Sequence, residues 1–315
     1  MEYVLLFPGQ GSQYKGMYSR LQTLYPGTKE LFREASDVLG FDLARLVEEE
    51  SMANLTASEN AQPAVIAASY ALFQAFSHSV KKAPLAAAGH SLGEISACIA
   101  AGAMAFSDGI RFARKRGEIM AGALKDRQGG AGIVVDFEES RLERLVGQVR
   151  ARNYITISAY NSPRQFIVAG SEEGLKALEE ELDRAGGQLI PFKMIPMKAD
   201  APYHSRQMEY LKEDLMETLG EIEFRTPKFP IWSSVTGTLQ TDASSLRKNF
   251  EEQLTTPVYW NQVLKQISRS GADCFVDIGP GDTIRNLVLE DPALGRPFAF
   301  DSEDGLENAA SDLQH

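Results

Sequence analysis

The chain contains 315 residues, 43% of them hydrophobic and 24% charged, and its 43 acidic and 32 basic side chains give a formal net charge of −11. These proportions are ordinary for a soluble globular enzyme, and the acidic balance argues against nucleic acid or an anionic membrane surface as a general partner. No stretch reaches the apolar length that spans a bilayer, and the first residues lack the basic start and long apolar core of an export signal.

Short apolar strands alternate with longer helices in the first part of the chain. A strand is predicted at residues 3–7 and ends before Pro8-Gly9. A second, short buried strand is predicted at the small apolar residues 83–88. Helical patterns of apolar residues occur around residues 28–39, 64–76 and 107–124. This alternation predicts an α/β fold with a largely parallel sheet.

The central third of the chain follows a different order of elements. A strand, a helix, two strands, a helix and a final strand are predicted in turn, at residues 131–135, 138–152, 154–159, 165–169, 172–185 and 188–192. This β-α-β-β-α-β order is that of a ferredoxin-like unit.

The α/β pattern then resumes with a strand, a helix and a strand, at residues 230–233, 260–268 and 274–278. We therefore predict a large α/β-hydrolase-like catalytic domain, formed by residues 1–127 and 197–315. A small ferredoxin-like domain, residues 128–196, is inserted into it. The cleft between the two domains is the expected position of a functional site.

The two cysteines, Cys98 and Cys274, lie within apolar patterns. Their spacing is not that of metal ligands, so no metal site is predicted from them. They are expected to be buried thiols, which favours a reducing, cytoplasmic environment.

The segment Gly89-His90-Ser91-Leu92-Gly93 fits the G-x-S-x-G pattern, in which a serine sits on a sharp turn between a strand and a helix. The residues before it suit the strand, and residues 94–101 have helical composition with apolar spacings of three and four. The pentapeptide alone is also compatible with a turn that has no chemistry. Its position between a strand and a helix favours Ser91 as a nucleophile.

A serine hydroxyl needs a general base, which is usually histidine. His90 adjoins the serine and is expected to form a structural hydrogen bond, while His78 ends an amphipathic helix and His315 ends an acidic tail. His204, in a turn-like segment beyond the small domain, is therefore the candidate base. No acid in a recognisable strand-end loop follows the serine, so an acid or a backbone carbonyl could orient the imidazole.

Acyl transfer also needs hydrogen-bond donors for the developing oxyanion. The amide of Leu92, directly after the candidate nucleophile, is the expected first donor. The second should come from another strand-end loop, and the glycine-rich residues 7–13 follow the first predicted strand. This loop lacks the Gly-Lys-Ser/Thr ending of a phosphate loop and a true G-x-G-x-x-G. We therefore predict a backbone donor near Gln10.

Five separated motifs resemble, in order, those of the malonyl-CoA:acyl carrier protein transacylase family, which includes acyltransferases of fatty-acid and polyketide synthesis. They span nearly the whole chain: residues 7–13, Gly89 to Glu94, Arg116-Gly117-x-x-Met120, the His204 segment and Gly279-Pro280-Gly281. The resemblance implies that Ser91 takes malonyl from malonyl-CoA as an ester after activation by His204. The group would then pass to the phosphopantetheine thiol of an acyl carrier protein. A monomer with no permanently bound cofactor is also implied.

The resemblance further implies roles for individual residues. The amides of Gln10 and Leu92 match the family's oxyanion donors. A main-chain carbonyl within residues 233–235 would orient His204, which would account for the missing triad acid. Gln62 matches a polar position that lines the family's pocket.

Selectivity for the acyl group is also implied by the resemblance. Arg116 matches the arginine that holds the free malonyl carboxylate, and a planar guanidinium suits two parallel hydrogen bonds to such a group. Arg114 and Lys115, its neighbours, are expected on a solvated helix face. Leu92 and Tyr203 match positions that carry leucine and an aromatic residue in malonyl-selective members, so both favour malonyl over methylmalonyl.

Three other functions remain possible from the sequence. An editing hydrolase that releases acyl groups from carrier proteins would share the serine and histidine, but such relatives often lose the arginine that Arg116 matches. A carrier-protein scaffold with a dead site would not need Ser91, His204 and Arg116 together. An unrelated serine esterase would need neither the Gln10 loop nor Arg116.

Overall fold

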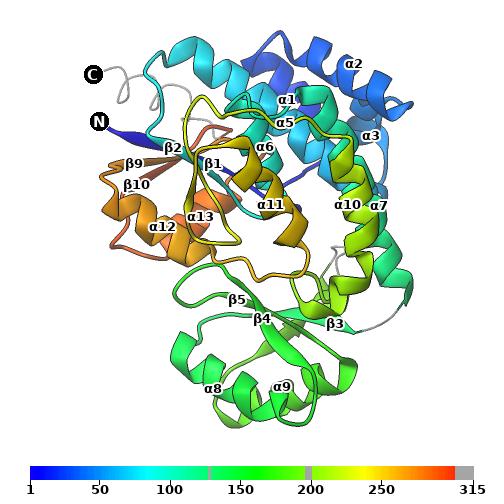
Figure 1. Ribbon diagram of the computed structural model, residues 1–315, viewed down its shortest axis with the longest axis vertical. Coiled ribbons are helices and arrows are strands. Elements are labelled where there is room, and N and C mark those ends of the chain that lie inside the picture. The colour runs from blue at the N-terminus through cyan, green and yellow to red at the C-terminus, as the bar shows by residue number, and fades with distance from the viewer. Residues whose placement is uncertain (127–128, 196–200, 302–315) are drawn as a thin grey trace.

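The computed structural model describes residues 1–126, 129–195 and 201–301, and it contains two β-sheets (Figure 1). The larger sheet has the strand order β10-β9-β1-β2-β7-β8. All its neighbouring strands are parallel except the last pair. The strands are β1 (Tyr3–Phe7), β2 (Ala86–Gly89), β7 (Ile231–Trp232), β8 (Leu239–Gln240), β9 (Cys274–Asp277) and β10 (Arg296–Ala299). The predicted α/β fold with a mainly parallel sheet is confirmed.

Helices cover both faces of the larger sheet (Figure 1). Alternate side chains of β1 point to opposite faces, so Leu5 packs in the core with α5, α6 and α7, whereas Leu6 packs with α12 and α13. A strand buried on both faces is typical of a parallel sheet. The helices around this sheet are α1 (Met17–Leu24), α2 (Thr28–Leu39), α3 (Leu43–Glu49), α4 (Met52–Leu55), α5 (Ser58–Ser79), α6 (Gly93–Ala100), α7 (Phe106–Asp126), α10 (Lys212–Gly220), α11 (Ala243–Gln253), α12 (Trp260–Arg269) and α13 (Thr283–Leu289), with the 3₁₀ turn η2 (Arg206–Leu211) before α10.

The smaller sheet is antiparallel, with the order β4-β5-β3-β6. Its helices α8 and α9 lie together on one face (Figure 1), where they share a separate apolar core with the strands. The elements are β3 (Gly130–Val134), α8 (Glu139–Arg150), β4 (Ile155–Tyr160), β5 (Phe166–Gly170), α9 (Glu172–Arg184) and β6 (Leu189–Pro191), followed by the 3₁₀ turn η1 (Phe192–Met194). This is the β-α-β-β-α-β series expected of a ferredoxin-like unit.

Backbone hydrogen bonds join the smaller sheet to the rest of the chain. Tyr160, at the end of β4, donates its amide to the carbonyl of Val258 at 2.8 Å, and Val258 donates to the carbonyl of Ser158 at 2.9 Å. Val258 lies between α11 and α12, so the smaller sheet is fixed close to the end of α11. The two predicted domain boundaries, at 127/128 and 196/197, fall outside the described residues.

Helix α5 begins at Ser58, earlier than the expected residue 64, and contains Pro63 within its second turn. Proline has no backbone N–H, so the carbonyl four residues earlier, that of Glu59, loses its helical donor. Arg114 of α7 donates to this carbonyl at 3.0 Å and to the side chain of Asn60 at 2.9 Å. The expectation of a solvated helix face for Arg114 is therefore only partly right, because its side chain is partly exposed but also links α7 to α5.

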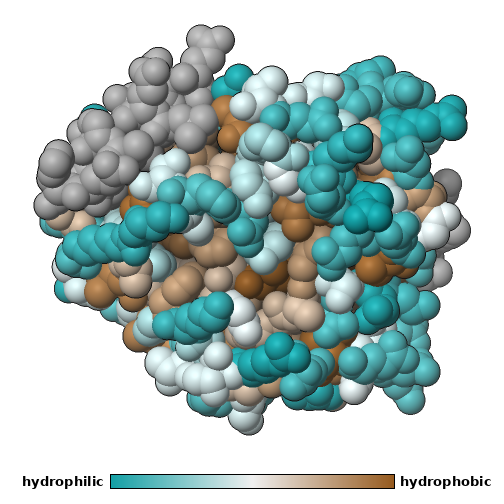
Figure 2. Space-filling view, turned by 90° about the horizontal axis from the view of Figure 1, so that it is seen from above, coloured by the Kyte–Doolittle hydropathy of each residue, from teal (hydrophilic) through white to brown (hydrophobic). Residues whose placement is uncertain are grey.

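The face seen from above carries hydrophilic residues over most of its rim and more hydrophobic ones toward its middle (Figure 2). Within the described ranges, no helix is long and apolar enough to cross a membrane. Cys98 and Cys274 are both buried, as the sequence predicts.

Candidate active site

Ser91 occupies the sharp turn between β2 and α6. Its φ of 51° lies in the left-handed region, which residues other than glycine adopt uncommonly. A Cβ at Gly89 would lie 2.0 Å from the carbonyl carbon of Gly93, and one at Gly93 would lie 2.1 Å from the carbonyl oxygen of Phe7. Any side chain at these two positions would overlap the backbone, so both require glycine. The glycine spacing is thus a consequence of the turn that presents Ser91.

His204 contacts Ser91 and is held by the backbone of α11. Its Nε2 lies 2.8 Å from Ser91 Oγ, and its Nδ1 lies 2.8 Å from the carbonyl oxygen of Gln253. A carbonyl can only accept, so Nδ1 carries the proton and Nε2 is left to accept from the serine hydroxyl. The expectation of an orienting carbonyl within residues 233–235 is wrong. Nδ1 faces Gln253, and the carbonyls of Ser233 and Ser234 accept instead from the amides of Gly237 and Tyr259.

The imidazole of His204 is in an environment that disfavours its positively charged, doubly protonated form. Burial, followed by the nearby positive charge of Arg116, lowers the pKa of His204 from its ordinary 6.5 to about 3, although the hydrogen bond to Gln253 opposes this shift. The histidine is therefore a neutral base over the physiological pH range.

This lowered pKa predicts an unusual pH profile for the nucleophile. The reaction of Ser91 with a neutral ester such as p-nitrophenyl acetate should keep its rate from about pH 8 down to about pH 5, because a base loses activity only as the pH falls through its own pKa. His204→Ala should lose the reaction throughout this range. A wild-type rate that halves near pH 6.5 would show an ordinary histidine and contradict the shift.

Arg116, on α7, is a buried cation beside the nucleophile. Only 1% of Arg116 is exposed. Its Nη1 donates to Gln62 Oε1 at 2.9 Å, and its Nη2 donates to Ser91 Oγ at 3.0 Å. Its Nε is buried and has no hydrogen-bond partner within the described part of the chain. Burial lowers the pKa of Arg116 to about 10, while the charge of Glu94 raises it, so the guanidinium stays protonated at neutral pH. It retains donors for an incoming anion.

Polar and aromatic side chains complete the wall around Arg116. Gln62 is fully buried and donates to Gln10 Oε1 at 3.2 Å and to the sulfur of Met120 at 3.1 Å. Tyr203, the residue before the base, donates its hydroxyl to the carbonyl of Met120 at 2.6 Å. The structure thus brings Gln62 and Tyr203 into one wall with Arg116.

The two expected oxyanion donors lie on neighbouring strand ends. Gln10 follows β1 and Leu92 follows Ser91, and β1 pairs in parallel with β2. Neither amide donates to another group among the residues that the structure describes, whereas the next amide of the loop, Gly11, is taken by Gln13 Oε1 at 2.8 Å. Two amides without a protein acceptor at this edge are suited to an oxyanion.

Ser91 and His204 open onto a cavity of about 520 Å³. It lies between the larger and the smaller sheet, where the site was expected. Its walls are largely apolar and come from both parts of the fold, including Met120, Ala131, Ile133, Ile167, Tyr203 and Leu287. Such a channel fits the flexible, mostly neutral arm of a thioester substrate.

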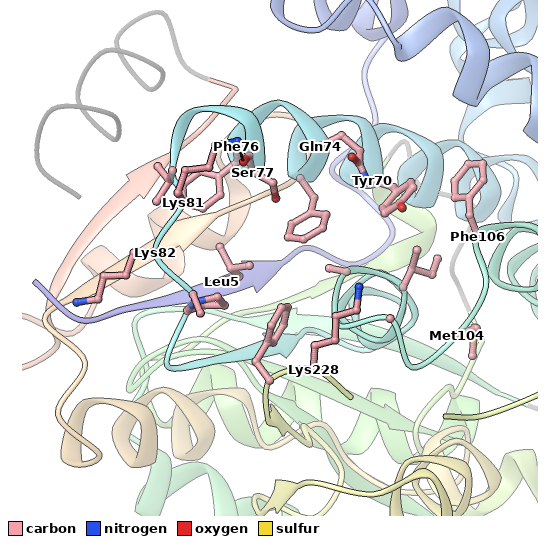
Figure 3. Close-up of a pocket in the computed structure, with 18 of the residues that line it drawn as sticks. Leu5, Tyr70, Gln74, Phe76, Ser77, Lys81, Lys82, Met104, Phe106 and Lys228 are labelled. Carbon is pink, nitrogen blue, oxygen red and sulfur yellow. Dashed lines mark hydrogen bonds between the residues drawn. The ribbon is translucent and has the colours of Figure 1, made fainter. Parts of the chain in front are cut away.

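A larger cavity, of about 850 Å³, lies below the C-terminal half of α5, between β1 and the segment that carries Lys228 (Figure 3). Among the described residues, its lining includes none of the predicted site residues and no histidine, cysteine or acid. Of its lysines, Lys82 pairs with Glu2 and Lys81 donates to the carbonyl of Ser77. The site is therefore distinguished by its chemistry, and it is the smaller cavity that Gln10, Ser91, Tyr203 and His204 line.

His90 and Gln253 show what the sequence did and did not reveal about this site. His90 turns away from Ser91, with its Nε2 2.8 Å from the Oδ1 of Asn161 after β4, as expected for a structural histidine. Gln253 was not anticipated, because a backbone carbonyl leaves no signature in sequence. Glu94 was also missed as a site residue, although an acid directly after the elbow glycine was visible.

Together, the α/β fold and the Ser91–His204 pair at its strand ends define a serine-nucleophile acyltransferase. In the described ranges, no group of three or more histidine, cysteine or acidic residues could hold a metal ion. The chain belongs to the acyl transferase domain family, whose model matches residues 4–290. The family resemblance expected from the five motifs is confirmed.

Similar proteins cover almost the full length of the chain. A malonyl CoA-acyl carrier protein transacylase of Bacillus subtilis is 32% identical over 310 residues, which is 98% of this chain and 96% of that protein. The structure of the malonyl CoA-acyl carrier protein transacylase from Coxiella burnetii superposes with a TM-score of 0.93 at 26% identity, covering 100% of this chain and 98% of the other. A malonyl-transacylase in complex with a type II polyketide synthase acyl-carrier protein gives a TM-score of 0.92 at 31% identity, with coverage of 99% and 100%.

Proposed function

We propose that this chain moves a malonyl group from malonyl-CoA, through an ester on Ser91, to the phosphopantetheine thiol of an acyl carrier protein. One observation carries the proposal. Ser91 Oγ lies 2.8 Å from Nε2 of His204 and 3.0 Å from Nη2 of Arg116, so a base and a buried cation meet at one nucleophilic oxygen. The names of the similar proteins support the same substrate and acceptor.

In the first half-reaction, His204 takes the proton of Ser91 as Oγ attacks the thioester carbonyl of malonyl-CoA. The carbonyl oxygen becomes negative and is held by the amides of Gln10 and Leu92. The tetrahedral intermediate then breaks its C–S bond, and the proton on His204 passes to the departing coenzyme A thiol. The products are a malonyl ester on Ser91 and free coenzyme A.

The second half-reaction runs the same steps in reverse with a different thiol. His204, neutral again, takes the proton of the phosphopantetheine thiol, which attacks the ester carbonyl. The same two amides hold the oxyanion, and Ser91 leaves with the proton from His204. Coenzyme A and the carrier protein end in the same pantetheine arm, so one channel serves both thiols.

The remaining parts of the proposal concern the surroundings of the reaction. No cofactor is bound permanently, because serine and histidine suffice for both half-reactions and pantetheine arrives with the substrates. We propose a monomer as the working unit, because Ser91, His204 and Arg116 already contact one another within a single chain. The two buried thiols, Cys98 and Cys274, support a reducing, cytoplasmic setting.

Mass spectrometry of the intact enzyme after separate mixing with malonyl-CoA and acetyl-CoA tests this function. We expect a persistent malonyl adduct that maps to Ser91 and little acetyl adduct. Rapid release of free malonate, with no carrier protein present, would instead identify an acyl hydrolase. The retained Arg116 and the names of the similar proteins support transfer over hydrolysis.

Tyr203 is expected to limit the size of the acyl group. Tyr203→Phe removes the hydrogen bond to the Met120 carbonyl but keeps the ring, so it should lower the free energy of unfolding by about 1 kcal/mol and preserve malonyl selectivity. Tyr203→Ser should admit 2-methylmalonyl, because the ring that crowds the methyl group is gone. Denaturant unfolding and adduct formation with both thioesters measure these effects. Continued exclusion of methylmalonyl by the serine variant would rule out this role.

A further inference from the structure

Glu94 is a buried carboxylate that the proposed reaction does not use. It lies in the first turn of α6, directly after the elbow, and only 1% of it is exposed. Four donors point at its two oxygens. Ser234 donates its amide at 2.6 Å and its hydroxyl at 2.9 Å to Oε1, while the side-chain amides of Asn249 and Gln253 donate to Oε2 at 2.6 and 2.5 Å. A carboxyl group that accepts from four donors and donates to none of them matches the charged form.

Gln253 connects this carboxylate to both members of the catalytic pair. Its backbone carbonyl accepts from Nδ1 of His204, and its side-chain amide donates to Glu94 and, at 3.0 Å, to the backbone carbonyl of Ser91. The carbonyl that orients the base thus belongs to a residue whose side chain is tied to Glu94 and to the elbow. Gln253 is the last residue of α11, where a helix end can otherwise fray.

The charges around Glu94 are also matched to the site. Burial raises the pKa of Glu94, and the four hydrogen bonds oppose this shift. Glu94 in turn raises the pKa of Arg116, so the buried anion helps to keep the carboxylate-binding guanidinium charged. A buried charge of this kind is costly in free energy unless all its hydrogen bonds are made. The segments that carry its four donors are therefore held in one arrangement.

We propose that Glu94 is the positioning residue of the catalytic base. It takes the place of the acid in a serine triad but does not touch the imidazole. Instead it anchors the side chain of Gln253, whose backbone carbonyl fixes the tautomer and direction of His204, while Ser234 and Asn249 complete the anchor. This inference rests on the proposed function only in requiring that Ser91 is acylated with His204 as base.

Glu94→Gln tests the anchor with little change in volume. The carboxamide turns an NH₂ group toward donors, so at least one of the four hydrogen bonds is lost. We expect the rate constant for acylation of Ser91 to fall about 10–100-fold, as small misplacements of a catalytic group do, with little change in KM for malonyl-CoA. Glu48→Gln, which changes a partly buried carboxylate that is remote from the site and accepts from the Ser19 amide, is the matched control and should behave as wild type.

Two readouts separate positioning from general support of the fold. The Nδ1 proton of His204 should give a resolved downfield signal in the proton NMR spectrum of the wild type, and Glu94→Gln should weaken or shift it while circular dichroism stays unchanged. Gln253→Ala keeps the carbonyl but loses its anchor, so it should show the same rate loss. Because both changes break one connection, the double variant should lose little more than the worse single variant.

A rescue variant tests the chemistry directly. Adding Asn249→Asp to Glu94→Gln returns a carboxylate to the cluster opposite the new amide, and the acylation rate should recover in part. A folded Glu94→Gln protein with the wild-type rate, or single losses that multiply in the double variant, would overturn the proposal. If Glu94→Gln does not fold, Gln253→Ala decides, and a wild-type rate for that variant overturns it equally.

A failure of the proposed function would give a different result from a failure of the proposed role of Glu94. A wild-type enzyme that is acylated by p-nitrophenyl acetate but not by malonyl-CoA would refute malonyl transfer. The role of Glu94 would still be measured with the ester, and a rate loss in Glu94→Gln there would support it.

Discussion

Replacing Ser91 with alanine should abolish the covalent malonyl adduct and lower transfer to a carrier protein by about 10⁶-fold, as loss of a serine nucleophile does in other enzymes. The oxygen that this change removes is contacted by both His204 and Arg116. Without it, no ester can form and neither half-reaction has a route. Intact mass spectrometry detects the adduct, and a coupled assay for free coenzyme A gives the rate.

Ser96→Ala is the matched control for this variant. Ser96 lies on α6, the helix that follows the Ser91 turn. It is fully buried, and its hydroxyl has no hydrogen-bond partner among the described residues. Its removal should leave adduct formation unchanged. A Ser91→Ala protein that still carries malonyl on a protein residue would move the nucleophile elsewhere and refute the site.

Arg116→Ala should abolish the preference of the enzyme for malonyl-CoA over acetyl-CoA. Two charged hydrogen bonds from the guanidinium to the malonyl carboxylate are worth about 1.5–3 kcal/mol each. At about 1.4 kcal/mol for each factor of ten, kcat/KM for malonyl-CoA should fall roughly 10²–10⁴-fold. Acetyl-CoA has no carboxylate, so in the wild type its methyl group offers no acceptor to the buried guanidinium. Its rate should therefore stay the same or rise.

Arg111→Ala supplies the control for this variant on the same helix. Arg111 is exposed and pairs with Asp108, so its loss should change neither rate. The measurement is the acylation rate of each variant with malonyl-CoA and with acetyl-CoA. Equal losses with the two thioesters in Arg116→Ala would assign the arginine to support of the fold and refute the carboxylate clamp.

The elbow could be predicted because its backbone conformation restricts the sequence. The close approach of Gly89 to Gly93 and of Gly93 to Phe7 excludes any Cβ, so the turn leaves a fixed pair of glycines around Ser91. The alternating apolar segments likewise identified the parallel sheet. Parallel strands bring their carboxyl ends to one edge, which is why the Gln10 loop and the elbow meet.

The support of His204 could not be predicted in the same way. Any residue offers a backbone carbonyl, so nothing in the sequence distinguishes Gln253 from residues 233–235 as its partner. Only the end of α11, and the bonds of Gln253 to Glu94 and Ser91, decide which carbonyl faces the imidazole. The same holds for Arg114, since its partner is a backbone carbonyl that Pro63 leaves unpaired.

Both catalytic residues have a left-handed backbone, which the glycine pattern marks at Ser91 but nothing in the sequence marks at His204. Ser91 has a φ of 51° and His204 a φ of 57°. Residues other than glycine adopt this region at a cost, and they do so where the surrounding contacts impose it. Here the contacts are the glycine turn for Ser91 and the carbonyl of Gln253 for His204.

The most direct test of malonyl transfer through Ser91 is a chase of the isolated acyl-enzyme. The enzyme is loaded with malonyl-CoA, freed of excess thioester and mixed with holo acyl carrier protein, and mass spectrometry follows both proteins. We predict that the malonyl group leaves Ser91 as an equal amount appears on the phosphopantetheine arm of the carrier, and that the apo carrier, without this arm, receives none. Loss of malonyl from Ser91 at the same rate with and without holo carrier, with free malonate as the product, would contradict the account.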